Sequence, residues 1–215
     1  MGRSPIALPR LMLVTDRRRT RGRPLVPLVA SAVRGGVGWV QLRERDLPDD
    51  ELRALVGQIR EVVPAGTLLS VNSSLRVART EKTGLHLPAA AAVTARTRLA
   101  GGPCGRSVHD DEELLRALDE GVDYVIAGGV FETASKPGRR SGGPALIERM
   151  ARQAEPTPVY GIGGITVGRV PAVLHAGAHG IALCGALLSA NEPQRVAQAL
   201  SLALEVTRTR MESGA

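Results

Sequence analysis

Short apolar and β-branched runs recur along this chain, and a segment with helical periodicity follows nearly every one of them. We predict eight strands, at residues 11–15, 39–43, 68–71, 84–87, 104–107, 123–127, 158–162 and 180–184. We predict helices at residues 24–35, 48–63, 74–80, 110–120, 143–154, 167–176 and 192–210, with only a weak turn in 88–97. Such alternation is typical of parallel strands covered by helices.

The ends of the predicted helices carry the expected residue types. Asp49 and Asp50 stand in a first turn, where the helix dipole favours negative charge, and Gly121 and Gly177 follow helical segments that they can terminate. No linker, low-complexity tract or shift in composition divides the 215 residues. We therefore predict one (β/α)8 TIM barrel spanning residues 1–215, with an open doubly wound sheet as the alternative.

Composition excludes several classes of protein. Hydrophobic residues make up 43% of the chain and charged residues 23%, which is typical of a globular domain. No apolar run approaches the roughly 20 residues that span a bilayer, and the stretch from Leu11 to Val14 is too short for a signal-peptide core. Cys104 and Cys184 lie far apart, without neighbouring ligand clusters. We expect a cytoplasmic protein with no membrane partner, no disulfide framework and no metal site.

The net charge of +7 is carried almost entirely by arginine, with a dense run at Arg17 to Arg19, Arg21 and Arg23. No aromatic residue is interleaved with this run, so it lacks platforms for stacking bases. We therefore expect no nucleic-acid partner and interpret the run as a solvated or anion-attracting loop. The sequence leaves open whether the chain forms a homo-oligomer.

Polar residues follow the predicted strands at the end where barrel enzymes carry their active sites. Gln41, Arg43 and Arg45 alternate along one strand, so their side chains share one face and can point into the barrel. Inward arginines need anions, which favours a ligand over an internal salt bridge, because Glu44 lies on the opposite face. Four further candidates follow other strands: Asn72, His86, Ser107 and His109.

Glycine-rich loops predict a phosphate site. Gly163 and Gly164 follow one strand, and Cys184 and Gly185 close the next, where backbone amides can approach an anion with no Cβ in the way. Strands 7 and 8 are where barrel enzymes commonly bind phosphate. The long loop after strand 6 adds further candidate donors, which are Thr133, Ser135 and Lys136. We expect this loop to act as a mobile lid over a phosphorylated small molecule.

Residues 11–205 resemble the thiamine phosphate synthase/TenI family of (β/α)8 barrels. The segments that carry the resemblance are Leu13-Val14-Thr15-Asp16, Val40-Gln41-Leu42-Arg43-Glu44-Arg45, Val71-Asn72, Gly84-Leu85-His86-Leu87, Gly105-Arg106-Ser107-Val108-His109, Asp123-Tyr124-Val125, Val130-Phe131-Glu132-Thr133, Lys136, Gly161-Ile162-Gly163-Gly164-Ile165 and Gly180-Ile181-Ala182. The resemblance implies a pocket for a thiazole phosphate, with the phosphate held by the loops after strands 6, 7 and 8.

The family resembled contains two activities. The synthase couples hydroxymethylpyrimidine diphosphate to thiazole phosphate with Mg²⁺, whereas TenI aromatises the thiazole by moving a proton. Ser73 and the run from Pro88 to Ala92 stand where the synthase pattern has acidic residues. Carboxylates usually hold Mg²⁺ on a diphosphate, so their loss weakens the synthase interpretation. We expect no cofactor, and Mg²⁺ only if synthase activity is retained.

The motifs around Arg43 and His109 are closer to the TenI branch, which predicts a thiazole tautomerase-type isomerase. The alternatives are a thiamine phosphate synthase and a binding or regulatory protein without catalysis. In the TenI pattern a catalytic histidine stands in the strand 6 loop, where this chain has Gly129. His109 and His86 are the candidates to transfer the proton in its place, because neutral imidazole suits proton transfer near pH 7.

Overall fold

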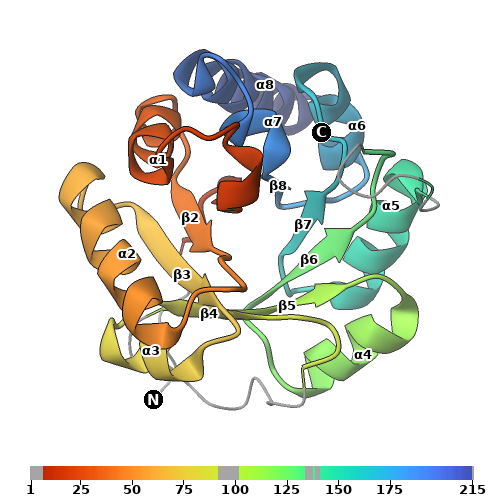
Figure 1. The fold of residues 1–215 in the computed structure, drawn as a ribbon. Coiled ribbons are helices and arrows are strands. Elements are labelled where there is room, and N and C mark those ends of the chain that lie inside the picture. Colours follow the sequence, from red (N-terminus) through yellow and green to blue (C-terminus); the bar gives the residue numbers. More distant parts are fainter. Residues whose placement is uncertain (1–6, 92–101, 134–137, 139–140, 215) are drawn as a thin grey trace.

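The computed structural model describes residues 7–91, 102–133, 138 and 141–214. Ser135 and Lys136 therefore lie outside the described residues. Eight parallel strands close into a barrel in chain order (Figure 1). The strands are β1 (Leu11–Val14), β2 (Trp39–Leu42), β3 (Leu68–Asn72), β4 (Gly84–Leu87), β5 (Cys104–Val108), β6 (Tyr124–Gly128), β7 (Val159–Ile162) and β8 (Gly180–Leu183). The predicted barrel is confirmed, and the open sheet is wrong.

Helices surround the barrel, as Figure 1 shows. The α-helices are α1 (Leu25–Arg34), α2 (Asp49–Val62), α3 (Leu75–Thr80), α4 (Asp111–Asp119), α5 (Gly143–Ala154), α6 (Val170–His175), α7 (Gly185–Leu188) and α8 (Pro193–Ser213). Two 3₁₀ helices, η1 (Arg17–Arg19) and η2 (Val167–Arg169), complete the set within the described residues. The sequence patterns predicted neither η1 nor α7, and they merged η2 with α6. None of the helices in the described part of the chain has the length and apolar character needed to cross a membrane.

Bulky aromatic side chains fill the amino-terminal end of the barrel interior. Trp39 stands at the start of β2, and its ring centroid lies 4.6 Å from that of Tyr124 and 5.6 Å from that of Tyr160. Polar atoms of these rings have partners: Trp39 Nε1 donates to Ser70 Oγ at 3.0 Å, and the Tyr160 hydroxyl donates to the Pro9 carbonyl at 2.7 Å. The amino end is therefore packed with side chains, so the open space lies at the carboxyl ends of the strands.

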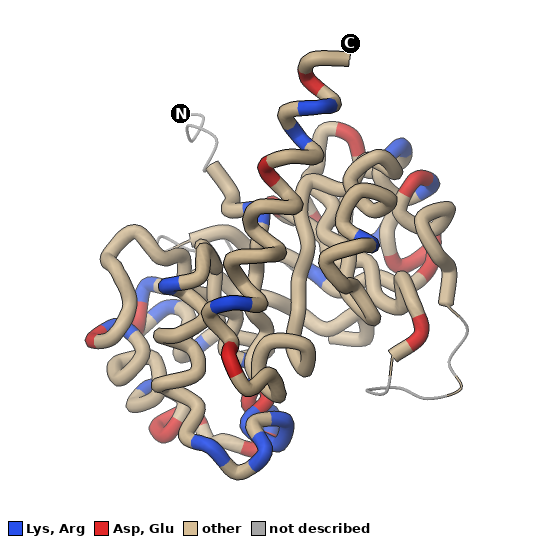
Figure 2. Tube along the Cα trace, turned by 90° about the horizontal axis from the view of Figure 1, so that it is seen from above, with Lys and Arg blue, Asp and Glu red and all other residues tan. Residues whose placement is uncertain are grey.

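The arginine run is only partly a solvated loop: Arg18 and Arg21 are exposed, but residues 17–19 form η1 and several of the arginines are paired. Asp16 caps η1, and ion pairs join Arg17 to Asp46 at 3.0 Å and Arg19 to Asp16 at 3.2 Å. Arg23 donates to the carbonyls of Leu188 and Ala190, which end α7 and follow it. Figure 2 shows basic and acidic residues interspersed on the trace. Carboxylates and carbonyls brought in by the fold thus pair much of this charge.

Candidate active site

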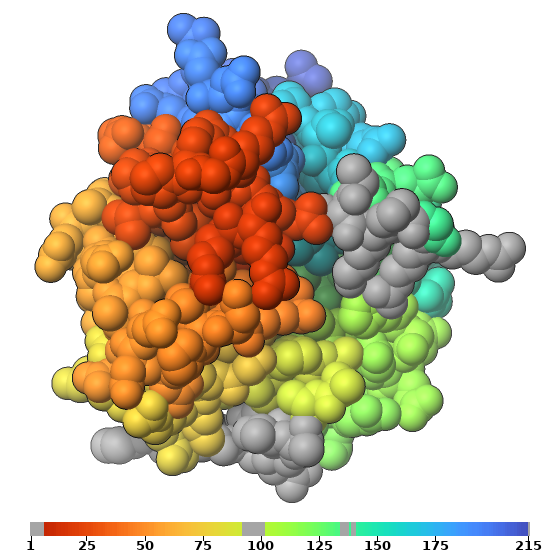
Figure 3. All heavy atoms as spheres, in the orientation of Figure 1, coloured from red at the N-terminus to blue at the C-terminus, as the bar shows by residue number. Residues whose placement is uncertain are grey.

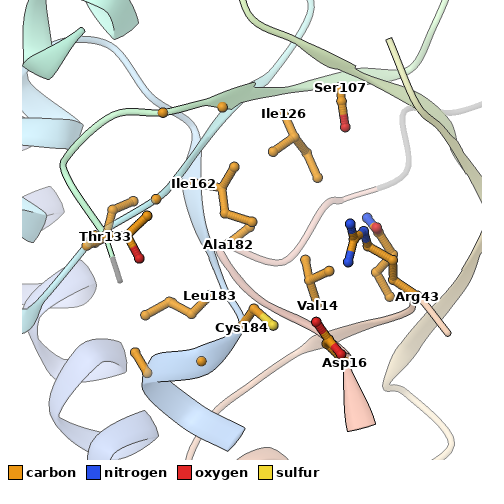
Figure 4. Close-up of a pocket in the computed structure, with 18 of the residues that line it drawn as sticks. Val14, Asp16, Arg43, Ser107, Ile126, Thr133, Ile162, Ala182, Leu183 and Cys184 are labelled. Carbon is orange, nitrogen blue, oxygen red and sulfur yellow. The ribbon is translucent and has the colours of Figure 1, made fainter. Parts of the chain in front are cut away.

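The carboxyl ends of the strands surround a cavity of about 600 Å³. The space-filling view along the barrel shows a recess there, between residues of the N-terminal region and residues of the middle of the chain (Figure 3). Four apolar side chains, Val14, Ile126, Ile162 and Ala182, are among those that line the cavity. Figure 4 shows them between Arg43 on one side and Thr133 on the other. The cavity therefore offers polar groups at two separated ends and an apolar stretch between them.

One polar end is built from the loops after β6, β7 and β8. Gly163 and Gly164 line the cavity with φ angles of 114° and 60°, in the region that favours glycine. A Cβ on Gly164 would lie 2.3 Å from the carbonyl oxygen of Glu132, so the β6 loop packs directly on this glycine. Within the described residues, the amides of Gly163 and Gly164 donate to no other group. They are available to an anion.

Further predicted phosphate ligands line the same end of the cavity. Gly185 and Ala186 begin α7, and amides in the first turn of a helix have no acceptor within it. Cys184 precedes them, and burial raises the pKa of its thiol to about 12, so the sulfur stays neutral and contributes shape rather than charge. Thr133 also lines the cavity. Ser189 lines this end as well, and its hydroxyl donates to the carbonyl of Gly185. The arrangement gathers backbone amides from two strand ends, with two hydroxyl residues beside them.

The other polar end comes from β2 and the residues after it. Gln41, Arg43 and Arg45 all line the cavity, although β2 ends at Leu42 and Arg45 is exposed at the rim. Burial, followed by repulsion from Arg45, lowers the pKa of Arg43. No carboxylate of the described residues forms an ion pair with either arginine. Glu44 instead turns away, buried beside Arg17, whose amide donates to Glu44 Oε2 at 3.0 Å. The two arginines therefore bring positive charge to this end of the cavity.

Asn72 and Ser107 connect the rim to the barrel wall. Both line the cavity. The Asn72 amide donates to Gln41 Oε1 at 3.4 Å and accepts from the Ser73 hydroxyl at 2.9 Å. The Ser107 hydroxyl forms a hydrogen bond with Nε2 of His86. These contacts orient the polar wall around the apolar stretch.

The two candidate histidines occupy different environments. His86 is 1% exposed, with Nδ1 3.0 Å from the Tyr124 hydroxyl and Nε2 2.8 Å from Ser107 Oγ. Burial, with smaller contributions from Arg43 and Arg106, lowers its pKa to about 3. Both ring nitrogens are engaged and the ring is held neutral. His86 is thus built as a link between β4, β5 and β6 rather than as a group that exchanges protons with a ligand.

His109 lies on the cavity wall, just beyond the end of β5. Its Nδ1 is 2.9 Å from Glu113 Oε2, and the same oxygen accepts the His109 amide at 2.7 Å. Within the described residues, no group contacts Nε2 as a hydrogen-bond partner. A carboxylate that holds one ring nitrogen leaves the other available for proton transfer. Sequence reasoning did not identify Glu113, although its i+4 spacing from His109 was a usable signal.

Gly129, which stands where the resemblance implies a catalytic histidine, has a φ angle of 84°. Its amide donates to the carbonyl of Ile162 at 3.0 Å, which ties the β6 loop to β7. A side chain at this position is strained by the backbone. The conformation suits the glycine that is present.

The wall after β4 contains no carboxylate where the synthase pattern has one. Pro88 and Ala89 line the cavity there, and their carbonyls accept hydrogen bonds from Nη1 of Arg106 at 3.3 Å and 3.0 Å. Arg106 is 1% exposed and pairs with Glu120 at 2.8 Å. Sequence reasoning did not identify this buried arginine as the residue that shapes the wall. Among the described residues, no three potential ligands cluster as a metal site.

The chain was compared with known proteins. A model of the TMP-TENI family, described as thiamine monophosphate synthase, matches residues 11–187. The chain belongs to this family. It is 36% identical to a putative thiamine-phosphate synthase of Geobacter sulfurreducens, over 94% of this chain and 97% of that protein. It is 35% identical to a thiamine-phosphate synthase of a Roseiflexus species, over 87% of this chain and 82% of that protein.

Solved structures agree with this membership. A thiamine phosphate pyrophosphorylase from Pyrococcus furiosus superposes with a TM-score of 0.80 at 27% identity, covering 92% of this chain and 96% of that one. The TMP-TENI chain is therefore an enzyme of a family that acts in thiamine biosynthesis. The predicted family is confirmed. The names of these relatives favour the synthase over the TenI branch that the motifs favour.

Proposed function

We propose that this TMP-TENI protein is a thiazole tautomerase-type isomerase that binds a phosphorylated thiazole in the barrel mouth. The observation that carries the proposal is the His109–Glu113 pair on the cavity wall, with Nδ1 held at 2.9 Å and Nε2 available to a ligand. The phosphate binds to the amides of Gly163, Gly164 and Gly185. The thiazole ring then lies on the apolar stretch between the two polar ends.

In this reaction His109 removes a proton from one ring atom of the thiazole and returns it to another. The product is an isomer, so no oxidant and no second substrate are needed. Glu113 stabilises the imidazolium that forms, because its carboxylate lies on the opposite ring nitrogen. Arg43 and Arg45 stabilise negative charge at the far end of the ligand.

The residues at the two positions where the resemblance implies carboxylates do not fit a magnesium ion, although Asp16, which pairs with Arg19, and Glu132 line the cavity elsewhere. The family resemblance implies carboxylates at two places where this chain has none. Ser73 stands at one of them, and its hydroxyl donates a hydrogen bond to the Asn72 side chain. Pro88 and Ala89 form the cavity wall at the other. Mg²⁺ is usually bound through one or two carboxylates together with substrate phosphates. The loss of both pattern carboxylates therefore favours an isomerisation that needs no metal.

A second candidate is the synthase reaction, because the relatives that span most of this chain are named for it. The pair of arginines without carboxylate partners would suit a diphosphate at the far end of the cavity.

One assay separates the candidates. The purified chain is incubated with the non-aromatic thiazole phosphate alone, and separately with aromatic thiazole phosphate, hydroxymethylpyrimidine diphosphate and Mg²⁺, and products are followed by NMR. Aromatisation in the first reaction, abolished by His109→Ala, supports the isomerase. Thiamine phosphate in the second reaction establishes the synthase instead. Tight binding of the thiazole phosphate without either product identifies a binding protein.

A further inference from the structure

Arg169 contacts two of the loops that form the glycine-rich end of the cavity. It ends η2, and its Nη1 donates to the carbonyl oxygen of Gly164 at 2.7 Å. The central carbon of its guanidinium lies 4.5 Å from the centroid of the Phe131 ring, which belongs to the β6 loop. Gly164 and Phe131 both line the cavity, whereas Arg169 is not among the lining residues. Arg169 therefore acts from behind the wall.

The two loops are also joined directly beside this contact. The Phe131 amide donates to the carbonyl of Gly163 at 3.0 Å. A Cβ on Gly164 would approach the Phe131 Cβ to 2.9 Å, so the loops are already in close contact. The stacking of Arg169 on Phe131 and its hydrogen bond to Gly164 hold the same pair of loops from the outer side. These contacts are placed where they can fix the spacing of the two loops at the glycine-rich end of the cavity.

The hydrogen bond to Gly164 has an electronic effect as well. A positively charged donor on a carbonyl polarises the whole peptide unit, and hydrogen bonds in series strengthen one another. The peptide that begins at the Gly164 carbonyl ends at the amide of Ile165, which also lines the cavity. Arg169 thus makes a wall amide a stronger donor without touching the ligand.

We propose that Arg169 is a positioning residue for phosphate, which sets the spacing of the β6 and β7 loops and strengthens the amide of Ile165. This inference rests on the phosphate site of the proposed function, but on neither of its candidate reactions. Any phosphate monoester bound at Gly163 and Gly164 depends on it.

The test measures inorganic phosphate binding to the full chain by calorimetry, together with amide hydrogen exchange at Phe131. Arg169→Ala is expected to weaken phosphate binding about tenfold and to speed exchange at Phe131, because it removes one charge-assisted hydrogen bond and one stacking contact. Arg169→Lys keeps the charge but loses the planar stack, so an intermediate loss is expected. Added guanidinium is expected to restore part of the affinity of Arg169→Ala.

Arg195→Ala is the matched control, because Arg195 is an exposed arginine on α8 that pairs with Glu192, the residue before that helix, and neither residue lines the cavity. It is expected to leave affinity and exchange unchanged, and all variants should share the unfolding temperature of the parent protein. Parental affinity in Arg169→Ala overturns the inference and leaves the phosphate site standing. A parent protein that does not bind phosphate refutes the site itself, and the inference with it.

Discussion

The imidazole of His109 lies directly over Gly128, so that a Cβ on this glycine would come within 2.9 Å of Cδ2 and 3.0 Å of Nε2. Gly128 is the last residue of β6 and also lines the cavity. Contacts of about 3 Å between a Cβ and a ring are too close for van der Waals packing. The missing side chain at Gly128 therefore makes the space that the ring of His109 occupies.

Gly128→Ala should displace the His109 ring and lower turnover of the thiazole by about 10- to 100-fold, because small misplacements of a catalytic group are costly. Steady-state kinetics check this, with phosphate affinity expected to stay unchanged. Gly57→Ala is the control, since a Cβ at Gly57 meets nothing within 4 Å. Parental turnover in Gly128→Ala would mean that the position of this ring is irrelevant.

His109→Ala should reduce kcat at least about 100-fold, and Glu113→Gln about 10- to 100-fold, because one removes the proton carrier and the other its stabilising carboxylate. Phosphate affinity should change little in both. Glu112→Gln is the matched control on the same helix, because this exposed carboxylate pairs with Arg116 and does not line the cavity. An unchanged kcat in His109→Ala would assign the proton transfer to another group.

Gly164→Ala should abolish phosphate binding. The new Cβ would lie 2.3 Å from the carbonyl oxygen of Glu132, and the backbone at Gly164 has a φ angle of 60° that disfavours alanine. The loops must separate to relieve both problems, so calorimetry should detect no binding at millimolar phosphate. Gly168→Ala, nearby in η2 with no atom within 4 Å of its Cβ, should bind like the parent protein. Retained affinity in Gly164→Ala would place the anion elsewhere.

Stability should fall with acid because of His86, whose pKa is lowered by burial to about 3. The unfolded chain takes up this proton below about pH 6.5 and the folded chain only near pH 3. Above about pH 6.5, His86 therefore leaves the free energy of unfolding unchanged. Between about pH 6.5 and pH 3 it lowers the free energy of unfolding by at most about 1.4 kcal/mol for each pH unit. Urea unfolding at pH 8, 6, 5 and 4 checks this.

His86→Gln removes the titrating group, so its stability should be lower at pH 8 but should depend less on pH below 6.5. His175→Gln on α6 is the control, because His175 is exposed and its loss should leave the slope as in the parent. Equal slopes in His86→Gln and the parent protein would show that other groups cause the acid sensitivity.

Local patterns determined the barrel. The eight strands were predicted to within one residue at each end, because apolar runs, first-turn carboxylates and terminal glycines act over a few residues. They also determined which side chains gather at the cavity, because the carboxyl ends of parallel strands meet at one face. The cavity is lined by residues that were predicted from their place at strand ends, among them Gln41, Arg43, Asn72, Ser107 and Gly163.

The sequence patterns did not predict the elements that are held by residues far away along the chain. The 3₁₀ helix from Arg17 to Arg19 is held by Asp46 and Glu44, which follow β2, and α7 ends against Arg23 from the β1 loop. Neither segment has enough periodicity of its own to predict a helix. Arg106 is a similar case, since only the fold brings the Pro88 and Ala89 carbonyls to a buried guanidinium.

The roles of the two histidines were decided only by tertiary structure. The sequence favoured His109, which follows a strand, over His86, which stands within one, but it could not show what either ring contacts. In the barrel, His86 lies between Tyr124 and Ser107, which belong to two other strands, while His109 lines the cavity and pairs through Nδ1 with Glu113 of the helix that follows it. Burial and hydrogen bonds between residues far apart in the chain exist only once it has folded, and they separate a structural imidazole from an available one.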